Sequence, residues 1–297
     1  MELLDFPIKL KSSKQKVTIH GLGDIHRAAL GCDSKQLRSD ISQIKAGHER
    51  GELHYWLGTG DWSNAIGPKD KRHDAAAIAP EFQEFVGDNL FGTEASVLAS
   101  EFKPIAHLGI GMGMGNHEDS IAKYNEYNPA KDIAERLDIP YLGYSAIIRL
   151  RLTSPSNSAT VLIFWHHGKG AAVTKGGKLN MLYGMRDIVQ ADVYMVGHVH
   201  ELLDFPEVRL SVNRRGTLRL IEDEILFINT GTYLKAYATD VAPLARGSFD
   251  HSSRVRPDYA EKKGYRPAII GHNGFQIQMV RKTKGWVTRL KRVDFRR

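Results

Sequence analysis

The first third of the chain alternates between short apolar runs and a longer amphipathic segment. Apolar runs cover Val17 to His20 and Leu53 to Leu57, and each leads into a Gly-Asp pair. Between the runs, Leu37, Ile41 and Ile44 recur at helical spacing, which predicts a helix over 34–48 that begins with Ser34 as its N-cap. Strand, helix and strand in this order are typical of parallel β-α-β units.

The rest of the chain is predicted to be mostly strands. A third strand is expected over 105–110, and helices are expected over 66–104 and near 179–190. Further apolar runs predict strands at 146–152, 160–165, 192–196, 206–212, 224–229, 267–271, 275–280 and 286–293. No repeat and no linker divides the sequence, so we expect one α/β domain over 1–297.

Length and composition narrow the class of protein. A chain of 297 residues with 42% hydrophobic and 25% charged residues is long enough to bury a sizeable core. No apolar stretch reaches the length that spans a bilayer, so we expect no membrane partner. The single cysteine excludes a disulfide framework and a cysteine-rich metal site. Since no signal peptide is visible either, the expected location is the cytoplasm.

The positive charge is concentrated at the C-terminal end. Residues 262–297 hold eleven Lys or Arg and one acid, so this segment carries +10 and the remaining 261 residues carry −3. A basic segment of this kind can attract nucleic acid. The alternative is an edge strand that its charges protect from aggregation, because neither face of the strand over 286–293 is purely apolar.

Polar residues that can bind metal follow several of the expected strands. Since ligands bind at the carboxyl ends of strands in open α/β sheets, these blocks are expected to meet. The blocks are Asp24-Ile-His26, Asp61, Asn116-His117-Glu118, His166-His167 and His198-Val-His200.

The residue types in these blocks suit one kind of chemistry. Carboxylate oxygens and neutral imidazole nitrogens bind divalent transition metals, and one aspartate can bridge two ions. Any one block alone is common in structures without a ligand. Five blocks in this order, each after an apolar strand, indicate a metal site.

The blocks together resemble those of the calcineurin-like metallophosphoesterase superfamily. The resemblance runs over residues 23 to 200 and is carried mainly by Gly115-Asn-His-Glu118 and Gly197-His-Val-His200. It implies a four-layer α/β/β/α sandwich with two mixed β-sheets and a dinuclear metal centre at one edge. Manganese is the expected metal, with Fe, Zn, Ni and Co as alternatives.

The resemblance also implies a role for each residue. One ion would be bound by Asp24, His26 and His200, and Asp61 would bridge. The second ion would be bound by Asn116, His198 and one histidine of the pair, for which His167 is preferred to His166. His117 would protonate the leaving group or, alternatively, stabilise the phosphoryl oxygens, and the residues expected to orient the ligands are Asn64, Glu118 and His166.

Two segments are expected to lie near this site. Residues 66–104 form a long insertion, expected to be helical and to flank the site, with an ordinary surface insertion as the alternative. Residues 169–178 are expected to form a mobile basic loop, in which Lys169, Lys175 and Lys178 would contact substrate phosphates. The alternative is a solvated loop without a role.

The expected function is metal-dependent hydrolysis of a phosphate ester, most simply a phosphodiester, with nucleic acid as one candidate substrate. The first alternative is a phosphomonoesterase that acts on a phosphoprotein or a small metabolite. The second is a protein without catalysis, either a scaffold like the retromer subunit of this fold or a nucleic-acid-binding protein. Related enzymes are often homodimers, so a homodimer is a further expectation.

Overall fold

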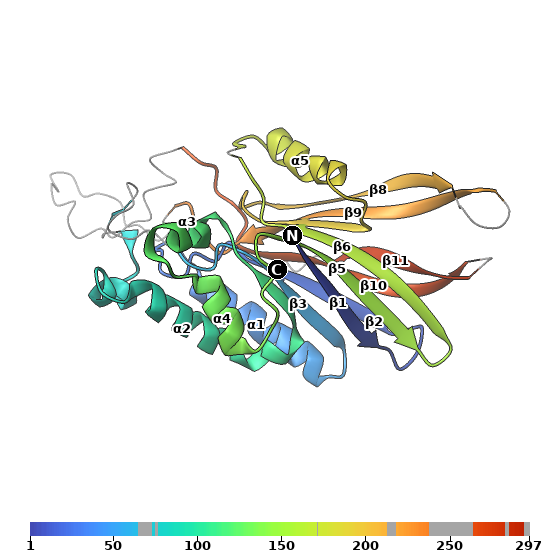
Figure 1. The fold of residues 1–297 in the computed structure, drawn as a ribbon, viewed down its shortest axis with the longest axis horizontal. Coiled ribbons are helices and arrows are strands. Elements are labelled where there is room, and N and C mark those ends of the chain that lie inside the picture. The colour runs from blue at the N-terminus through green and yellow to red at the C-terminus, as the bar shows by residue number, and fades with distance from the viewer. Residues whose placement is uncertain are drawn as a thin grey trace, which may run out of the picture.

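The computed structural model describes residues 1–64, 73–74, 77–170, 172–212, 218–237, 264–282 and 285–293. Its strands form two sheets that pack face to face (Figure 1). The first sheet contains β2 (Lys16–Leu22), β3 (Leu53–Thr59), β4 (Gly109–Gly113), β10 (Gly271–Lys282) and β11 (Gly285–Val293). The second contains β1 (Glu2–Lys9), β5 (Ser145–Ser154), β6 (Asn157–His166), β7 (Val193–Val196), β8 (Leu202–Val212) and β9 (Leu220–Thr232).

Both sheets are mixed, as the resemblance implied. In the first, β2, β3 and β4 are parallel, whereas β10 is antiparallel to β2 and to β11. In the second, β6, β7 and β9 are parallel, β5 is parallel to β1 and antiparallel to β6, and β8 is antiparallel to β9. A short antiparallel pairing of β9 with β10 joins the two sheets. The parallel strands of both sheets therefore direct their carboxyl ends toward one edge.

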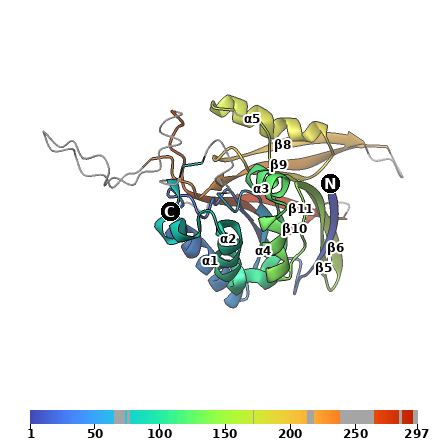
Figure 2. The same cartoon turned by 60° about the vertical axis from the view of Figure 1, so that its left-hand side comes forward.

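Helices cover the two outer faces (Figure 2). The first sheet is covered by α1 (Ser34–Glu49), α2 (Leu90–Phe102) and α4 (Pro129–Leu137), whose apolar sides share a core with Trp56. The second sheet is covered by α5 (Lys175–Tyr183), which packs against Phe164 and Phe227. The remaining helical elements are α3 (Asn116–Asn125), η2 (Pro80–Phe85), η3 (Lys103–Leu108) and η4 (Gly184–Asp187).

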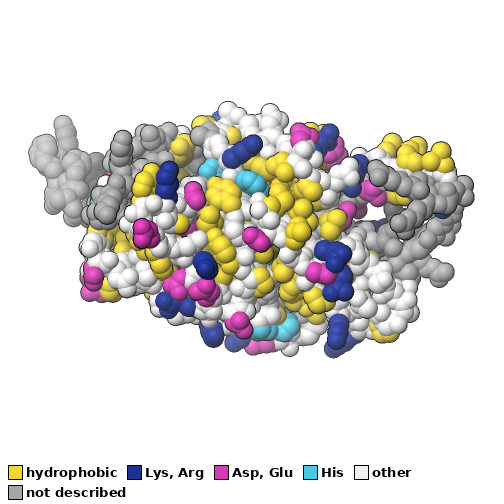
Figure 3. All heavy atoms as spheres, in the orientation of Figure 1, with side chains coloured by type: hydrophobic (Ala, Val, Ile, Leu, Met, Phe, Trp, Pro, Cys, Tyr) yellow, Lys and Arg dark blue, Asp and Glu magenta, His cyan; other side chains and the backbone are white. Residues whose placement is uncertain are grey.

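The largest core lies between the sheets. Ile19 and Ile277 from the first sheet meet Ile163 and Trp165 from the second, and all four are fully buried. Helix, sheet, sheet and helix thus form four layers, which confirms the predicted architecture. Acidic and basic side chains are scattered over the face in Figure 3, between small apolar patches. Within the described ranges, no helix is long and apolar enough to cross a membrane.

Some element boundaries were predicted wrongly. Residues 103–108 form the 3-10 helix η3, and the strand expected over 105–110 is instead β4, which begins at Gly109. Ile105 and Leu108 are buried from a helical turn, so their apolar side chains resembled those of a strand. Residues 267–270 form no strand. Asp33, one residue before the predicted Ser34, is the N-cap of α1 and accepts from the Gln36 N–H at 3.0 Å.

Several expectations concern residues beyond the described ranges. Of the insertion over 66–104, positions 66–72 and 75–76 lie outside them, and the described remainder holds η2 and α2. Of the basic segment 262–297, positions 262–263, 283–284 and 294–297 lie outside them, and the described remainder holds β10 and β11.

Candidate metal centre

The expected metal-binding residues meet at the edge where the parallel strands end. Asp24 and His26 follow β2, Asp61 follows β3, and Asn116 begins α3 just after β4. From the second sheet, His167 follows β6, and both His198 and His200 follow β7. Residues 170 positions apart in sequence are thus in contact because both sheets direct the ends of their parallel strands here.

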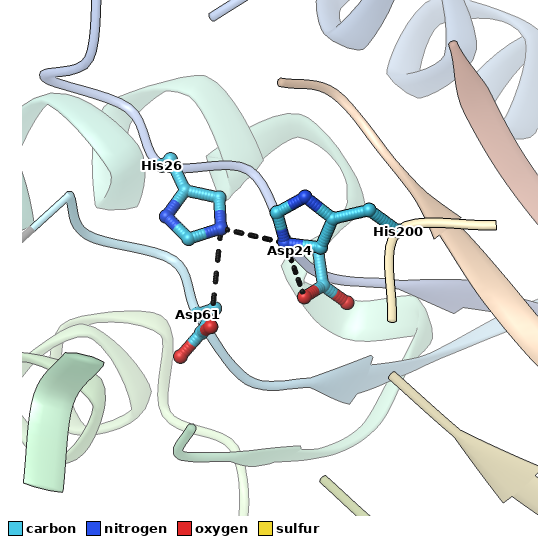
Figure 4. Close-up of side chains that lie close together, drawn as sticks. All are labelled: Asp24, His26, Asp61 and His200. Atoms are coloured by element: carbon cyan, nitrogen blue, oxygen red, sulfur yellow. Dashed lines mark hydrogen bonds and ion pairs between the residues drawn. The ribbon is translucent and has the colours of Figure 1, made fainter. Parts of the chain in front are cut away.

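Four of these residues form a first ligand group, drawn in Figure 4. Asp24, His26, Asp61 and His200 each offer one ligand atom, and these atoms all lie within 4.8 Å of one another. His200 Nε2 is 3.2 Å from Asp24 Oδ1 and 3.1 Å from His26 Nε2, which is 3.8 Å from Asp61 Oδ2. Two imidazole nitrogens and two carboxylates therefore converge on one small space.

A second ligand group shares Asp61 with the first. It contains Asp61, His167 and His198, with ligand atoms again within 4.8 Å of one another. Asp61 Oδ2 lies 3.4 Å from His167 Nε2. The amide oxygen of Asn116 lies 2.8 Å from His198 Nδ1 and 3.2 Å from His167 Nε2. One carboxylate that belongs to two adjacent groups is the arrangement of a bridging ligand.

The electrostatics of the two groups suit metal ions. Burial, and next to it the charge of His117, lowers the pKa of His26 well below its usual value, so its nitrogens stay neutral and can bind a metal. Burial opposes ionisation of Asp61, but His167 and His117 outweigh it and hold the pKa of this carboxyl well below its usual range. Against the effect of burial, Asp61 raises the pKa of His167 to about 9. The Asp61 carboxylate is therefore ionised, and a metal ion would displace the proton that His167 otherwise holds.

The backbone of the ligand residues is strained. Of the seven non-glycine residues with positive φ in the described ranges, five are ligands of these groups: Asp24 (48°), His26 (50°), Asp61 (51°), His198 (71°) and His200 (49°). Such conformations cost on the order of 1–2 kcal/mol each and cluster at functional sites. They persist because the turns are tied together: the Asp24 N–H donates to the Gly60 carbonyl, and the His198 N–H donates to the Asp24 carboxylate.

His117 lies beside both groups in the first turn of α3. Its ring meets that of His26 edge-on, with centroids 4.5 Å apart, and its Nδ1 contacts the Asn64 carbonyl oxygen. Its backbone N–H donates to Asp61 Oδ1 at 3.0 Å. It belongs to neither ligand group, so its ring is placed next to the centre without being bound within it.

The Glu118 side chain forms hydrogen bonds with the backbone of the loops that carry the ligand residues. Fully buried, its carboxylate accepts the backbone N–H groups of Asp61 (3.0 Å), Gly115 (2.8 Å) and Ser63 (2.8 Å). Burial and the nearby Asp61 raise its pKa to about 8. Asn64 was expected to orient ligands; its backbone N–H donates to Glu94 and its carbonyl oxygen contacts His117 Nδ1.

The two adjacent histidines have different positions. His167 is fully buried within the second ligand group, whereas His166 accepts from the Gly168 N–H through Nδ1 at 2.8 Å. The His166 ring packs edge-on against Tyr144, and burial lowers its pKa to about 4. Successive residues of a strand point to opposite faces, which explains why only one of the pair reaches Asp61.

The expected basic loop is partly a helix. Thr174 is the N-cap of α5, so Lys175 and Lys178 are helical residues rather than loop residues. Both form ion pairs with the same acid, Glu201, at 3.7 Å and 3.1 Å, so one carboxylate is shared by two lysines. Lys169 has no acid within ion-pair distance in the described part of the chain. Substrate contact by these lysines stays a prediction.

One residue of this site, Glu94 in α2, was not expected. Its Oε1 accepts the backbone N–H groups of Ala28 and Asn64, each at 2.7 Å, so it joins the loops after β2 and β3. It is fully buried, and burial raises its pKa to about 7. The sequence did contain a signal, because Glu94 lies at helical spacing between the apolar residues Leu90 and Leu98.

Comparisons with known proteins add little. No protein-family model and no curated protein matches the sequence. Solved structures with some likeness include a single mutant of Vps29 from Entamoeba histolytica (13% identity, 94% of this chain, 99% of that chain, TM-score 0.33). Others are vacuolar protein sorting 29 from Cryptosporidium parvum (11%, 94%, 99%, 0.30) and Vps29 from Chaetomium thermophilum (11%, 93%, 95%, 0.33). At these TM-scores the likeness carries no weight, and the site is interpreted from its own geometry.

Proposed function

We propose that this protein is a divalent-metal-dependent phosphoesterase with a dinuclear centre, and that its preferred substrate is a phosphodiester. The observation that supports this most is the position of Asp61 in two adjacent ligand groups. Nitrogen and oxygen donors in this mixture suit Mn²⁺ and related ions. When bound, two such ions supply a water of lowered pKa and a clamp for the phosphoryl oxygens.

The protein's own residues would do the rest. Asp24, His26 and His200 would bind one ion, Asn116, His167 and His198 would bind the other, and Asp61 would bridge them. Glu118 and Glu94 would fix the ligand loops through backbone N–H groups. The His117 ring would give a proton to the leaving oxygen, since it lies next to His26 but outside both ligand groups.

The charges near the site bear on the choice between a diester and a monoester. A monoester at neutral pH carries close to two negative charges, whereas a diester carries one. Lys175 and Lys178 are already paired with Glu201, so of the three lysines expected here, only Lys169 lacks an acidic partner among the described residues. Since Lys175 and Lys178 share one carboxylate, the three lysines and Glu201 carry a net charge of +2 before metal binds, which accommodates either ester, and the assay below decides between them.

The test is hydrolysis of bis(p-nitrophenyl) phosphate and of p-nitrophenyl phosphate by metal-stripped protein to which Mn²⁺ is restored. We expect turnover of the diester with the higher kcat/KM. Asp61→Asn should lose the second Mn²⁺ and the turnover. The matched control is Asp119→Asn, because Asp119 is an exposed acid in the same first turn of α3 as His117.

Three other outcomes would decide against parts of the proposal. A preference for the monoester would keep the metal centre and overturn the diester. Turnover by Asp61→Asn equal to that of Asp119→Asn would overturn the bridging role. Failure to hydrolyse either ester with two Mn²⁺ bound would argue against a phosphoesterase. Repeating the assay with Fe²⁺, Zn²⁺, Ni²⁺ and Co²⁺ tests the choice of manganese.

A further inference from the structure

Away from the metal centre, three histidines form a hydrogen-bonded chain on the helix-covered face of the first sheet. His20 on β2 contacts His54 on β3 (Nε2 to Nδ1, 2.9 Å) and His272 on β10 (Nδ1 to Nε2, 2.8 Å). An acidic side chain lies at each end of this chain of three histidines. His54 Nε2 is 2.9 Å from Glu52 Oε2, and His272 Nδ1 is 2.9 Å from Asp40 Oδ2.

To satisfy all its hydrogen bonds, the three-histidine chain needs one proton more than three neutral imidazoles carry. Each of the four contacts requires one N–H, and three neutral rings supply three. Asp40 also accepts from Tyr233 Oη (2.8 Å) and from Gln36 Nε2 (2.8 Å), which is the behaviour of an ionised carboxylate. Hydrogen bonds from Arg50 and His54 lower the pKa of Glu52, so this end is ionised too. With both acids accepting, the four contacts are all satisfied only when one imidazole is an imidazolium.

The surplus proton belongs at an end of the chain. Burial, and then the charges of His272 and His54, lowers the pKa of His20 well below its usual value, so the central ring is neutral. The proton therefore sits on His272 beside Asp40 or on His54 beside Glu52. It can move between them without breaking a contact: His272 passes its Nε2 proton to His20 Nδ1 while His20 passes its Nε2 proton to His54 Nδ1.

The His54 end of the three-histidine chain opens into a pocket of about 500 Å³. Lys14, Lys16, Thr18, His54 and Gln276 line it, together with Glu52 and four further residues. It lies at the starts of β2 and β3, so the length of the sheet separates it from the ligands that follow these strands. A volume of this size suits a small molecule or one segment of a polymer.

Positive charge prevails in this pocket. Neither Lys14 nor Lys16 has an acid within ion-pair distance in the part of the chain that the structure describes. The one acid in the lining, Glu52, is already paired with Arg50 (3.2 Å) and His54 (2.9 Å). Thr18 and Gln276 add neutral donors.

The basic C-terminal strand continues this surface. Gln278 of β10 is opposite both Lys16 and Arg289, and Gln276 is opposite both Thr18 and Lys291. Residues opposite one another in neighbouring strands share a face of the sheet. Both β11 cations are exposed. Arg289 and Lys291 thus lie on the same side of the sheet as the pocket.

We propose that this pocket binds a phosphoryl group, with Lys14 and Lys16 as counter-charges and the histidine-chain proton, drawn to His54, as the third positive charge. The inference does not rest on the proposed function, because it uses none of the metal-binding residues. A free phosphate and a phosphate of a nucleic-acid strand share the required chemistry, and Arg289 and Lys291 would add affinity only for the longer ligand.

The first test is an NMR titration of the ¹⁵N-histidine-labelled full chain, stripped of metal, with inorganic phosphate against chloride at matched ionic strength. The His54 signals are assigned from their absence in His54→Gln. We expect a saturable shift of these signals toward imidazolium values. Lys14→Gln with Lys16→Gln should weaken binding about tenfold or more, since two charge-assisted contacts are lost. Lys9→Gln with Lys11→Gln, two exposed lysines outside the pocket, is the matched control.

The second test uses a short single-stranded oligonucleotide. If Arg289→Gln with Lys291→Gln weakens the oligonucleotide but not inorganic phosphate, the ligand is a polymer phosphate. If phosphate alone binds, the ligand is a free phosphate or a small ester. Both results support the site. Absence of a saturable His54 shift with either ligand, or binding that the Lys14 and Lys16 changes leave intact, overturns it. Asp61→Asn should bind normally, which separates this site from the metal centre.

Discussion

The Glu118 carboxylate accepts the backbone N–H of Asp61 at 3.0 Å. Asp61 is the residue that the two ligand groups share, so its position depends on a side chain in the first turn of α3. Glu118 also accepts the N–H of Gly115, the N-cap of that helix, at 2.8 Å. Helix capping and placement of the shared ligand are therefore functions of the same carboxylate.

Glu118→Gln should destabilise the protein by about 1–3 kcal/mol. An amide has one acceptor oxygen, so it can keep the N–H groups of Asp61 and Gly115, but its NH₂ then faces the N–H of Ser63 in a buried site. The measurement is urea unfolding of the metal-stripped protein at a pH above 8, because Glu118, with its pKa of about 8, is a carboxylate only there. Glu135→Gln, an exposed position on α4, should change stability by less than about 0.5 kcal/mol. Equal stability of the two variants would show that the Glu118 carboxylate does not stabilise these loops.

Gly115→Ala tests how closely the loops are packed. A Cβ atom at this position would lie 2.0 Å from Asp61 Oδ1 and 2.6 Å from the Asp61 nitrogen, so the carboxylate would have to move. We expect loss of at least one Mn²⁺ in calorimetric titration and a loss of about 1–3 kcal/mol in stability. Gly176→Ala is the control, because nothing lies within 4 Å of its Cβ and the residue is in α5. Normal metal stoichiometry in Gly115→Ala would contradict the geometry.

The sequence was sufficient to predict the edge at which the site lies. β2, β3, β6 and β7 appear close to their expected positions because each is a buried apolar run that ends at a turn. Parallel strands then bring the residues that follow them to one edge. This step requires only the direction of the strands, so residues as distant in sequence as Asp24 and His200 could be grouped without a structure.

Features that depend on distant partners could not be predicted. β1 is an edge strand whose partner among the described strands is β5, about 140 residues later, and only one of its residues is buried, so its sequence gives little local signal. The contact between Glu94 and the loops after β2 and β3 is also long-range. The helix α4 is different, since Asn128 followed by Pro129 is a local helix start that was overlooked.

His117→Ala should separate metal binding from proton transfer. The backbone N–H that donates to Asp61 is retained in alanine, and His117 is in neither ligand group, so two Mn²⁺ should still bind. Hydrolysis of a diester with a poor leaving group should fall by about 10²–10⁴, and that of the p-nitrophenyl diester far less. His107→Ala, an exposed histidine before β4, is the control. Equal loss on both esters would remove His117 from the role of proton donor.

Glu94 should make stability depend on pH between about 4.5 and 7. Burial raises its pKa to about 7 in the folded protein, whereas the unfolded chain has the ordinary value of 4.5. Between these values the folded state holds a proton that the unfolded state has lost, so stability is greatest below about pH 4.5 and falls as pH rises toward 7. A shift of this size corresponds to a loss on the order of 3–4 kcal/mol.

Glu94→Gln should remove this dependence. Its amide oxygen can still accept the Ala28 and Asn64 N–H groups, and it has no proton to lose. Urea unfolding of the wild type and the variant at several pH values isolates the effect, because all other titrations cancel in the difference. That difference should move in favour of the variant from pH 5 to pH 7.5. The exposed acid Glu84, changed to Gln, should give a constant difference. If the stabilities of the wild type and of Glu94→Gln change with pH in the same way, the Glu94 carboxylate is ionised throughout this range, stabilised by its two backbone donors.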